Sequence, residues 1–492
     1  MDFLDRFEPQ AVIRHFVNIC NIPHPSGHEE GVREYVRKCA DEHGHDYHID
    51  EGGNIIVYVK ASPGCEGVAP YMIQAHMDMV PAKEEGSTHD FLKDPISLRL
   101  VDDHYLYANG TTLGADNAVG MMYMLTLMED DTVIHPPLEL LFTTREEVGL
   151  QGIREVDFSK ISSRRMMNMD CGEPGVMCVS TAGAAQCLVK LPLTEEALCG
   201  SLFKLSVSGL LGGHGGLLID SGRLSAVSAV GRILCAMARE TSYNIIDAHC
   251  PRFSGIPTDM QVLLALPQDG VEKAQLACDR VAKELCAEYA DPEKDLTVKL
   301  SALDESADRP AGMLTADCSL ALARLLYLIP FGVTRRDFRE KETVLCSNNT
   351  VEVFCRDGFA QMEMMVRSPL DTVKQDVVDR IEMLAGLCGA QMILLDSFAG
   401  WPYRGDSPMQ RLCRETYREL TGKELVIEKE NACAETGPIL GAIPDMDCIA
   451  TAPYSKGAHT PKEHLDLETV GPFWEFLKLL LKKMCDSADD RI

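Results

Sequence analysis

The chain has 492 residues, of which 46% are hydrophobic and 25% charged, which is typical of a globular protein and not of a disordered one. At about 100–200 residues per domain, this length predicts two or more domains. The 47 Lys and Arg residues against 75 Asp and Glu residues give a formal net charge of −28. This balance argues against nucleic-acid and anionic-membrane partners, because both are bound through basic surfaces.

Cysteine usage and the N-terminus predict a cytoplasmic protein. Nineteen cysteines are present, but the number is odd and no two of them are spaced as Cys-x-x-Cys. The acidic start Met-Asp-Phe-Leu-Asp lacks the basic and apolar regions of a signal peptide, and no apolar run approaches the about 20 residues of a membrane span. We therefore expect most cysteines to be buried as small apolar side chains in a reducing compartment, and no membrane association.

The first part of the chain alternates between helical and strand patterns. Apolar residues at three- and four-residue spacing predict helices over 8–20, 28–42 and 117–129. Between the first two, Ser26 lies in a Pro/Ser/Gly break and is a candidate helix cap. Short apolar or β-branched runs predict strands over 54–60, 71–75 and 136–144. Strands alternating with helices predict an α/β fold with a mixed, mainly parallel sheet.

The pattern changes in the middle of the chain. Residues 201–208 alternate as a strand with one solvated face, a helical pattern covers 221–239, and further elements are predicted over 350–368, 371–388 and 391–398. These elements predict an α+β domain inserted into the first domain. The expected division is therefore 1–185 for the first part of the α/β domain, 186–398 for the insert, and 399–492 for the second part.

Two motifs place acidic and imidazole side chains near strand ends and loops, the usual position of α/β active sites. In QAHMDMV, His76 and Asp78 are two residues apart, so in an extended segment they share a face and the carboxylate can orient a metal-binding imidazole. In TTLGADNAVG, Asp116 lies among small residues at a predicted helix start, where it could cap the helix or approach a metal closely. Each motif alone is more typical of an ordinary surface pair or capping residue than of a metal ligand.

Three further motifs complete a potential metal site. Glu146 and Glu147 follow a strand directly and point to opposite sides, so one can bind metal while the other faces a water molecule as general base. Asp170 ends another predicted strand, and His459 lies in a small-residue loop far along the chain. Nitrogen and oxygen ligands in this number suit two Zn²⁺ ions about 3.5–4 Å apart that share a carboxylate, with Mn²⁺ or Co²⁺ as substitutes. Only Cys171 among the cysteines falls in these motifs, which favours an open catalytic site.

In this order the motifs resemble the M20 metallopeptidase family, and within it the bacterial aminoacyl-histidine dipeptidase branch. Further segments that carry the resemblance are IPHPSGHEE at 22–30, GGHGG at 212–216, VRSPLDT at 366–372 and GAHTPKEHLDL at 457–467. The resemblance implies two zinc ions per subunit. The implied roles are His76 and Asp170 on one ion, Glu147 and His459 on the other, Asp116 bridging them, Asp78 orienting His76, and Glu146 as general base.

The same resemblance implies roles in the insert and the substrate pocket. Residues 186–398 would form a lid domain that mediates a homodimer, and His214 would meet the substrate or its developing oxyanion. Asn349, Arg367 and Glu435 keep positions that could contact a small peptide substrate. The chain departs from the branch at Phe253–Pro257 and at Asn431–Glu435, where the branch reads His-Ala-Gly-Leu-Glu. Hydrolysis is therefore implied more firmly than a preference for a C-terminal histidine.

Three functional hypotheses follow. The first is a cytosolic di-zinc dipeptidase that hydrolyses Xaa-His or other dipeptides. The second is a related amidohydrolase acting on N-acyl amino acids or other small amides, which would use the same metal ligands. The third is a non-catalytic metal-binding protein, which would be expected to lack Glu146 or one of the ligands, whereas this chain has them all.

Overall fold

The computed structural model describes residues 4–170, 173–252, 255–303 and 312–486. The chain divides into two compact units, and each contains its own hydrophobic core. Unit 1 comprises Met1–Ser180, Pro402–Lys429 and Ala434–Ile492, and unit 2 comprises Thr181–Trp401 and Glu430–Cys433. Within the described ranges, every helix is too short or too polar to span a lipid bilayer.

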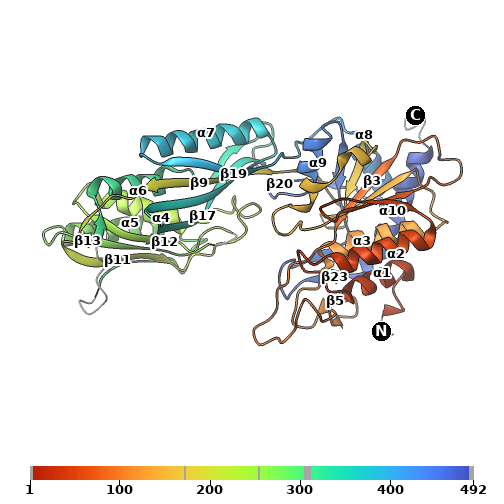
Figure 1. Ribbon diagram of the computed structural model, residues 1–492, viewed down its shortest axis with the longest axis horizontal. Helices are drawn as coiled ribbons and strands as arrows, with labels where there is room; N and C mark the ends of the chain where they lie inside the picture. The colour runs from red at the N-terminus through yellow and green to blue at the C-terminus, as the bar shows by residue number, and fades with distance from the viewer. Residues whose placement is uncertain (1–3, 171–172, 253–254, 304–311, 487–492) are drawn as a thin grey trace. The chain divides into compact units, whose positions relative to one another are not determined.

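Unit 1 is built on an eight-stranded sheet (Figure 1). In spatial order its strands are β1 (Asp46–Ile49), β2 (Ile55–Val59), β6 (Leu138–Thr143), β3 (Tyr71–His76), β7 (Arg165–Asn168), β21 (Asp447–Ala450), β8 (Val176–Thr181) and β20 (Val426–Glu430). The neighbours β6, β3, β7 and β21 are parallel. The pairs of β1 with β2, β2 with β6 and β21 with β8 are antiparallel. The predicted mixed α/β fold is confirmed, with the parallel strands at the centre of the sheet.

The central strands are apolar because both faces of the sheet are covered. Every residue of β3 and β6 is buried, as expected for parallel strands between helical layers. Helix α3 packs on β3, α1 and α2 pack on α3, and α8 packs on both β21 and α10 (Figure 1). The helices of unit 1 are α1 (Gln10–Cys20), α2 (Glu30–His43), α3 (Ala115–Glu129), α8 (Pro408–Thr421), α9 (Thr436–Ala442) and α10 (Val470–Asp486).

Glycine at position 120 allows α3 to approach the sheet closely. A Cβ atom on Gly120 would lie 2.7 Å from the Cβ of Ala75 and 2.8 Å from the Cβ of Met169. These distances are shorter than normal carbon–carbon contacts, so only glycine fits here without a shift of the helix. Because Ala75 and Met169 immediately precede His76 and Asp170, the fit of α3 bears directly on the candidate site.

A small antiparallel sheet joins two distant segments of unit 1. Its strands are β22 (Ser455–Lys456), β23 (His464–Asp466), β5 (Tyr105–Ala108) and β4 (Leu98–Val101), in that order. Register pairs place Leu465 opposite Leu106 and Ser455 opposite Leu465. The loop that carries His459 connects β22 to β23 and is therefore anchored at both ends.

Unit 2 is an α+β structure with antiparallel sheets. Its five-stranded sheet contains β16 (Gly332–Arg336), β17 (Val344–Arg356), β18 (Phe359–Ser368), β9 (Gly183–Pro192) and β19 (Gln391–Ser397). Its four-stranded sheet contains β12 (Asn244–His249), β13 (Met260–Leu266), β11 (Ser201–Ser208) and β14 (Thr297–Ala302). A short pair joins β10 (Glu195–Ala197) to β15 (Gly312–Leu314). The helices are α4 (Ala226–Met237), α5 (Val271–Glu288), α6 (Ala316–Leu328) and α7 (Asp371–Leu387).

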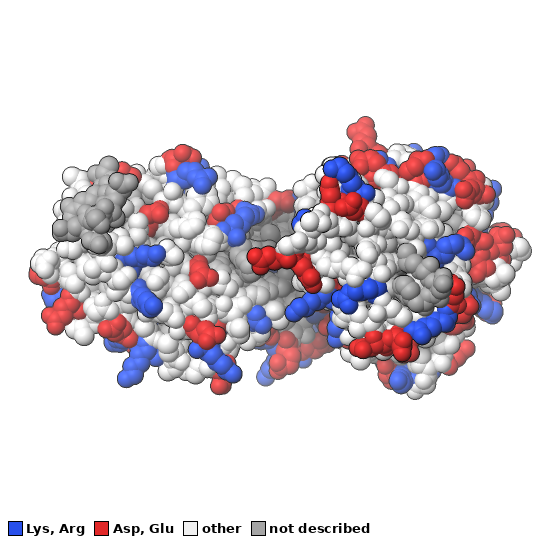
Figure 2. Space-filling view, turned by 90° about the horizontal axis from the view of Figure 1, so that it is seen from below, with Lys and Arg blue, Asp and Glu red and all other residues white. Residues whose placement is uncertain are grey.

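Charged side chains are exposed at the surface, and most cysteines are buried. On the face shown in Figure 2, acidic and basic side chains are intermixed. The 18 cysteines in the described ranges are all unbonded thiols, and 12 of them are buried. Most therefore pack as small apolar side chains, as the sequence predicts. Cys171 lies outside the described residues.

Candidate metal centre

Three neighbouring parallel strands bring the motif residues to one edge of the main sheet. Strand β3 ends at His76, and it lies between β6, which leads to Glu146 and Glu147, and β7, which leads to Asp170. The backbone ladder continues past the strands, because Met77 N–H donates to the carbonyl of Thr143 at 2.7 Å. Since the carboxyl ends of parallel strands meet at the same edge, side chains far apart in the sequence converge there.

Asp116 lies between two imidazoles. Its Oδ1 is 2.9 Å from Nε2 of His76, and its Oδ2 is 3.4 Å from Nε2 of His459. Asp170 Oδ1 lies 3.6 Å from the same nitrogen of His76, and Glu147 Oε1 lies 2.8 Å from that of His459. The result is two groups, each of one imidazole and two carboxylates with ligand atoms within 4.8 Å of one another, and Asp116 belongs to both.

The electrostatics of this cluster reflect many acids in a small, poorly hydrated volume. Burial and the charge of Asp116 raise the pKa of Asp170 to about 7. Burial also raises the pKa of Glu147, although its hydrogen bond with His459 opposes the shift. Hydrogen bonds to Asp116 and Glu147 raise the pKa of His459 to about 10. Positive charge among these carboxylates is therefore strongly favoured, whether protons or metal ions supply it.

The donor set fits divalent metal ions. Imidazole nitrogens and carboxylate oxygens are ligands of Zn²⁺, and carboxylates also suit Mn²⁺, whereas none of the described cysteines belongs to the cluster. Metal ligands must be deprotonated, so a bound cation would replace the protons that these side chains otherwise hold. His459 has a positive φ of 66°, a left-handed backbone conformation that is uncommon for residues other than glycine.

Asp78 lies beside His76 and also contacts the loop that carries Glu146 and Glu147. Its Oδ1 lies 3.5 Å from Nδ1 of His76 and accepts a hydrogen bond from Glu146 N–H at 2.9 Å. Its Oδ2 accepts hydrogen bonds from Glu147 N–H at 3.2 Å and from Ser26 Oγ at 2.7 Å. Ser26 is therefore not a helix cap, since α2 begins four residues later at Glu30. The Asp78 carboxylate thus binds the backbone that carries the paired glutamates, and the Asp78 backbone carbonyl accepts a hydrogen bond from Nδ1 of His76 at 3.0 Å.

Glu146 belongs to a third group with His76 and Glu147. Burial and the nearby charge of Asp170 raise the pKa of Glu146 well above that of an exposed glutamate. A carboxylate whose pKa is raised toward neutral pH can accept a proton and later return it, which suits a general acid–base group. The two neighbouring glutamates thus differ in environment, because Glu147 bonds to His459.

Glu463 is not among the residues that the motifs predict, yet it holds the loop that carries Asp116. Its carboxylate is 2% exposed and accepts hydrogen bonds from the backbone N–H groups of Leu113 at 2.8 Å, Gly114 at 2.9 Å and Asp116 at 3.0 Å. Gly114 adopts a positive φ of 73°, which favours glycine and allows successive amides to face one carboxylate. The only sequence signal is an acidic residue four positions after His459.

Glu435 lies in a buried network beneath the cluster. Its Oε2 accepts hydrogen bonds from Gln74 Nε2 and, at 2.7 Å, from Thr143 Oγ1. Asn168 Nδ2 donates to Gln74 Oε1 at 2.6 Å, so the network crosses the ends of β6, β3 and β7. Burial raises the pKa of Glu435 to about 8. Glu435 is predicted to contact substrate, but its hydrogen bonds in the structure are with the buried side chains of Gln74 and Thr143.

The other predicted residues belong to unit 2. Nδ1 of His214 accepts hydrogen bonds from Leu217 N–H at 2.9 Å and Gly216 N–H at 3.3 Å, which leaves the ring proton of the neutral imidazole on Nε2. Asn349 is buried and donates to the carbonyl of Gly255 at 2.9 Å. Arg367 donates to Sγ of Cys433 at 2.9 Å. Phe253 and Ser254 lie outside the described residues.

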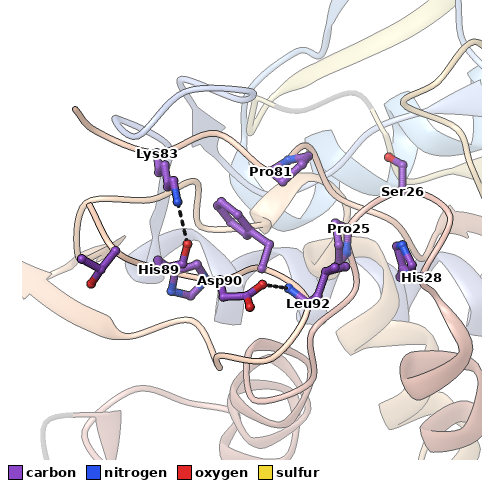
Figure 3. A pocket seen from close by; sticks show the side chains of 10 residues that line it. Pro25, Ser26, His28, Pro81, Lys83, His89, Asp90 and Leu92 are labelled. Carbon is purple, nitrogen blue, oxygen red and sulfur yellow. Dashed lines mark hydrogen bonds between the residues drawn. The ribbon is translucent and has the colours of Figure 1, made fainter. Parts of the chain in front are cut away.

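A separate pocket of about 480 Å³ lies elsewhere in unit 1 (Figure 3). It is lined by Pro25, Ser26, His28, Pro81, Lys83 and residues 88–92. Lys83 Nζ donates to the carbonyl of His89 at 2.8 Å, which ties the two sides of this loop together. The pocket contains none of the predicted metal ligands, but Ser26 connects it to Asp78.

Comparisons with known proteins agree with this architecture. The sequence profile of peptidase family M20/M25/M40 matches residues 72–483. A cytosol non-specific dipeptidase of Escherichia coli (strain K12) is 34% identical over 487 residues, covering 98% of this chain and 99% of that protein. The structure of an aminoacylhistidine dipeptidase from Vibrio alginolyticus has a TM-score of 0.86 and 28% identity, covering 98% of each chain. A tripeptidase from Staphylococcus aureus shares the fold, with a TM-score of 0.57, 13% identity, and coverage of 98% of this chain and 100% of that one.

The fold and the family match together define a metallopeptidase. The chain belongs to peptidase family M20/M25/M40. The resemblance read from the motifs is thereby confirmed.

Proposed function

We propose that this protein is a dipeptidase that hydrolyses small peptides at a two-metal centre in unit 1. The observation that carries the proposal is the position of Asp116, whose two oxygens face different imidazoles, each completed by a further carboxylate. A carboxylate shared in this way is the arrangement that a pair of divalent ions requires. The two relatives named as dipeptidases support the substrate class.

The distances in the cluster support the ligand assignment that the resemblance implies. His76 and Asp170 would hold one ion, Glu147 and His459 the other, and Asp116 would bridge them. The nitrogen and oxygen donors support zinc as the metal, with two ions per subunit and Mn²⁺ or Co²⁺ as substitutes. When bound, such ions lower the pKa of water and stabilise negative charge that develops on a carbonyl oxygen.

The protein's own residues supply the proton transfers. Glu146 accepts a proton from the water molecule while the oxygen of that water forms a bond to the peptide carbonyl carbon. Glu146 then delivers this proton to the amide nitrogen as the carbon–nitrogen bond breaks, so one peptide and one water give two amino acids. Asp78 would keep the Glu146 backbone in place through its carboxylate, and the His76 ring through its backbone carbonyl, which accepts a hydrogen bond from Nδ1 of His76 at 3.0 Å. We propose His214 as a substrate-binding residue, because its backbone partners make Nε2 a hydrogen-bond donor.

We also propose a cytoplasmic homodimer that forms through the insert. The relative from E. coli is named a cytosol dipeptidase, and the unbonded thiols are consistent with a reducing compartment. The edge strand β19 exposes Ile393, Leu394 and Leu395, and α7 exposes Met383 and Leu387. Such apolar side chains at a sheet edge support self-association. Light scattering of the purified protein would give its mass in solution, and a monomer at micromolar concentration would contradict the proposed dimer.

A hydrolysis panel tests the proposed activity. Metal-loaded protein would be assayed with Xaa-His dipeptides, other dipeptides, tripeptides and N-acyl amino acids, each with and without a chelator. We expect dipeptides to be cleaved, Xaa-His peptides among them, and chelation to abolish cleavage until metal is restored. Faster hydrolysis of N-acyl amino acids than of any dipeptide would favour the amidohydrolase hypothesis. Full activity in metal-free protein would contradict the two-metal centre.

A further inference from the structure

The pocket shown in Figure 3 lies entirely within unit 1, and none of the proposed metal ligands lines it. Its volume of about 480 Å³ falls in the range of about 300–1,000 Å³ that is usual for small-molecule sites. Four apolar residues belong to the lining, namely Pro25, Pro81, Phe91 and Leu92. Leu92 is 56% exposed, so an apolar group bound beside it would remove this side chain from water.

The charged and ionisable side chains of the pocket are mainly basic. They are His28, Lys83 and His89, whereas Asp90 is the one acid among the described lining residues. Asp90 is already paired, because its Oδ2 lies 2.7 Å from Nζ of Lys93, which is outside the lining. Lys83 Nζ donates to the carbonyl of His89 and forms no ion pair with a carboxylate in the described part of the chain. The Lys83 ammonium therefore keeps its charge and two of its three N–H groups for a ligand.

His89 provides a second hydrogen-bonding group close to Lys83. Its Nε2 is buried and has no hydrogen-bond partner among the described residues. Its ring packs edge-on against the ring of Phe91, with 4.6 Å between the centroids and 72° between the planes. A buried polar atom without a partner is unfavourable, so a ligand oxygen that accepts a hydrogen bond from Nε2 would stabilise the occupied pocket.

These groups define the chemistry of a ligand. A carboxylate accepts charge-assisted hydrogen bonds from an ammonium and can accept a further one from an imidazole N–H. Asp90 in the same lining favours a singly charged carboxylate over a doubly charged phosphate, because like charges repel. In Figure 3, Lys83 and His89 lie at one end of the view and Pro25 at the other. A ligand that fills the pocket would therefore place its carboxylate near Lys83 and its apolar part toward Pro25.

We propose that this pocket is a second binding site, separate from the metal centre, for a small monocarboxylate with an aliphatic side chain. Free aliphatic amino acids and carboxylic acids of the same size without an amino group share this chemistry. The inference goes beyond the proposed dipeptidase function and does not depend on it, because it uses only the pocket and its lining.

Calorimetric titration of the metal-loaded protein with four small molecules tests the ligand class. Leucine and isocaproate carry both the carboxylate and the aliphatic chain, whereas leucinamide lacks the carboxylate and glycine lacks the side chain. We expect dissociation constants on the order of 1–10 mM for the first two, as for ligands of this size, and at least about tenfold weaker binding of the others. The ratio of the leucine and isocaproate affinities distinguishes amino acids from acids without an amino group. Equal affinity for leucinamide and leucine would overturn the inferred carboxylate site.

Variants of the lining test the location. Lys83→Met removes the charge and should weaken leucine binding at least about tenfold, whereas Lys83→Arg keeps the charge and should bind nearly as the wild type does. Leu92→Asp places a negative charge on an exposed lining residue and should also weaken binding. Lys60→Met is the matched control. Lys60 is exposed and follows Val59, which pairs with Leu138 at the start of β6, so it lies at the edge of the sheet opposite to the metal centre.

A comparison with chelated protein separates the pocket from the metal centre. Because the lining contains none of the proposed ligands, leucine should bind with equal affinity before and after metal removal. Binding that disappears on chelation would place the carboxylate on the metal ions and overturn the inference. Wild-type affinity in both Lys83→Met and Leu92→Asp would overturn it as well.

Folding and activity are kept apart from this result. A circular dichroism spectrum confirms that each variant is folded, and Leu92→Asp carries the test if Lys83→Met unfolds, because Leu92 is exposed. The titration measures binding and not hydrolysis, so failure of the carboxylate site would leave the dipeptidase proposal standing. In the same way, a protein that cleaves no dipeptide but binds leucine in this pocket would refute only the proposed function.

Discussion

Adjacent glutamates with different surroundings are central to the candidate site. Glu147 bonds to the His459 ring, whereas Glu146 faces the charge of Asp170 and has a strongly raised pKa. Both backbone N–H groups are held by the single carboxylate of Asp78. Glu147 can therefore serve as a metal ligand and Glu146 as a proton carrier, because the Asp78 carboxylate holds the backbone of both residues in place.

Substituting Glu146 tests the proton-carrier role. Glu146→Gln keeps the size and polarity of the side chain but removes its ability to accept a proton. We expect kcat to fall by at least about 10²-fold, the lower range for a general acid–base group, while metal content measured by plasma mass spectrometry stays near that of the wild type. A variant with wild-type turnover would eliminate Glu146 as the base.

Substituting Glu463 tests how the bridging aspartate is positioned. Glu463→Gln leaves one carbonyl oxygen for three backbone N–H groups, so the 113–116 loop should lose part of its support. We expect zinc affinity, measured by competition with a chromophoric chelator, to fall about 10–100-fold, as for other residues that orient metal ligands.

The exposed Glu66, whose carboxylate accepts a hydrogen bond from the backbone N–H of Gly64 at 2.9 Å, provides the matched control. Glu66→Gln should leave the zinc affinity unchanged. Equal zinc affinity in Glu463→Gln and in the wild type would show that the hydrogen bonds from the 113–116 loop to Glu463 are not needed for metal binding.

Site residues could be predicted where the neighbouring sequence indicates the end of a strand. His76 and Asp170 are recognisable because each follows an apolar strand, and parallel strands gather their ends. Glu463 escapes prediction because its partners are backbone amides about 350 positions earlier, and backbone amides have no signature in the sequence. Ser26 looks like a helix cap locally, but its partner Asp78 lies 52 residues away.

At the scale of elements, the fit between α3 and the sheet can be tested through Gly120. In Gly120→Ala the new methyl group would overlap the side chains of Ala75 and Met169, so α3 must shift away from β3. We expect the free energy of unfolding to fall by about 1–3 kcal/mol, as for overpacked cores, and zinc binding to weaken. Urea denaturation and metal titration would measure the two effects.

A second helical glycine controls for helix propensity. Gly386, in α7, has no atom within 4 Å of the position of an added Cβ. Gly386→Ala should therefore be neutral or stabilise the protein by up to about 1 kcal/mol. If both alanine variants behaved alike, close packing of α3 would not explain the presence of glycine at position 120.

Elements with strong periodicity are the ones that the sequence predicts best. The strand predicted over 201–208 coincides with β11, and the helix predicted over 371–388 ends one residue earlier, at Leu387. The helix predicted over 221–239 begins only at Ala226 and ends at Met237. Gly222 has a positive φ of 75° and Ser225 is extended, so the chain is not helical before Ala226. The strand predicted over 54–60 coincides with β2, whereas β1 and β8 are not predicted. The antiparallel direction of all three strands is not predicted either, because it depends on distant pairing.

At the scale of the whole molecule, all proposed metal ligands lie in unit 1. Binding that occurs only in the folded state stabilises that state, by about 4 kcal/mol when the free metal is 1,000 times the dissociation constant. We expect chelation to speed hydrogen exchange in residues 73–78, 113–117 and 455–463, and to leave β17 and β18 of unit 2 unchanged. A uniform increase over both units would contradict a centre confined to unit 1.

The discontinuous course of unit 1 has a consequence for the chain during its synthesis. The strand β21 lies between β7 and β8, and Glu463 binds the 113–116 loop, so residues 447–463 are built into the middle of the sheet and into the site. A nascent chain that has emerged only as far as residue 400 has an incomplete sheet and lacks His459. The ribosome must therefore translate past residue 463 before the metal centre can form, and products that end before it cannot assemble this site.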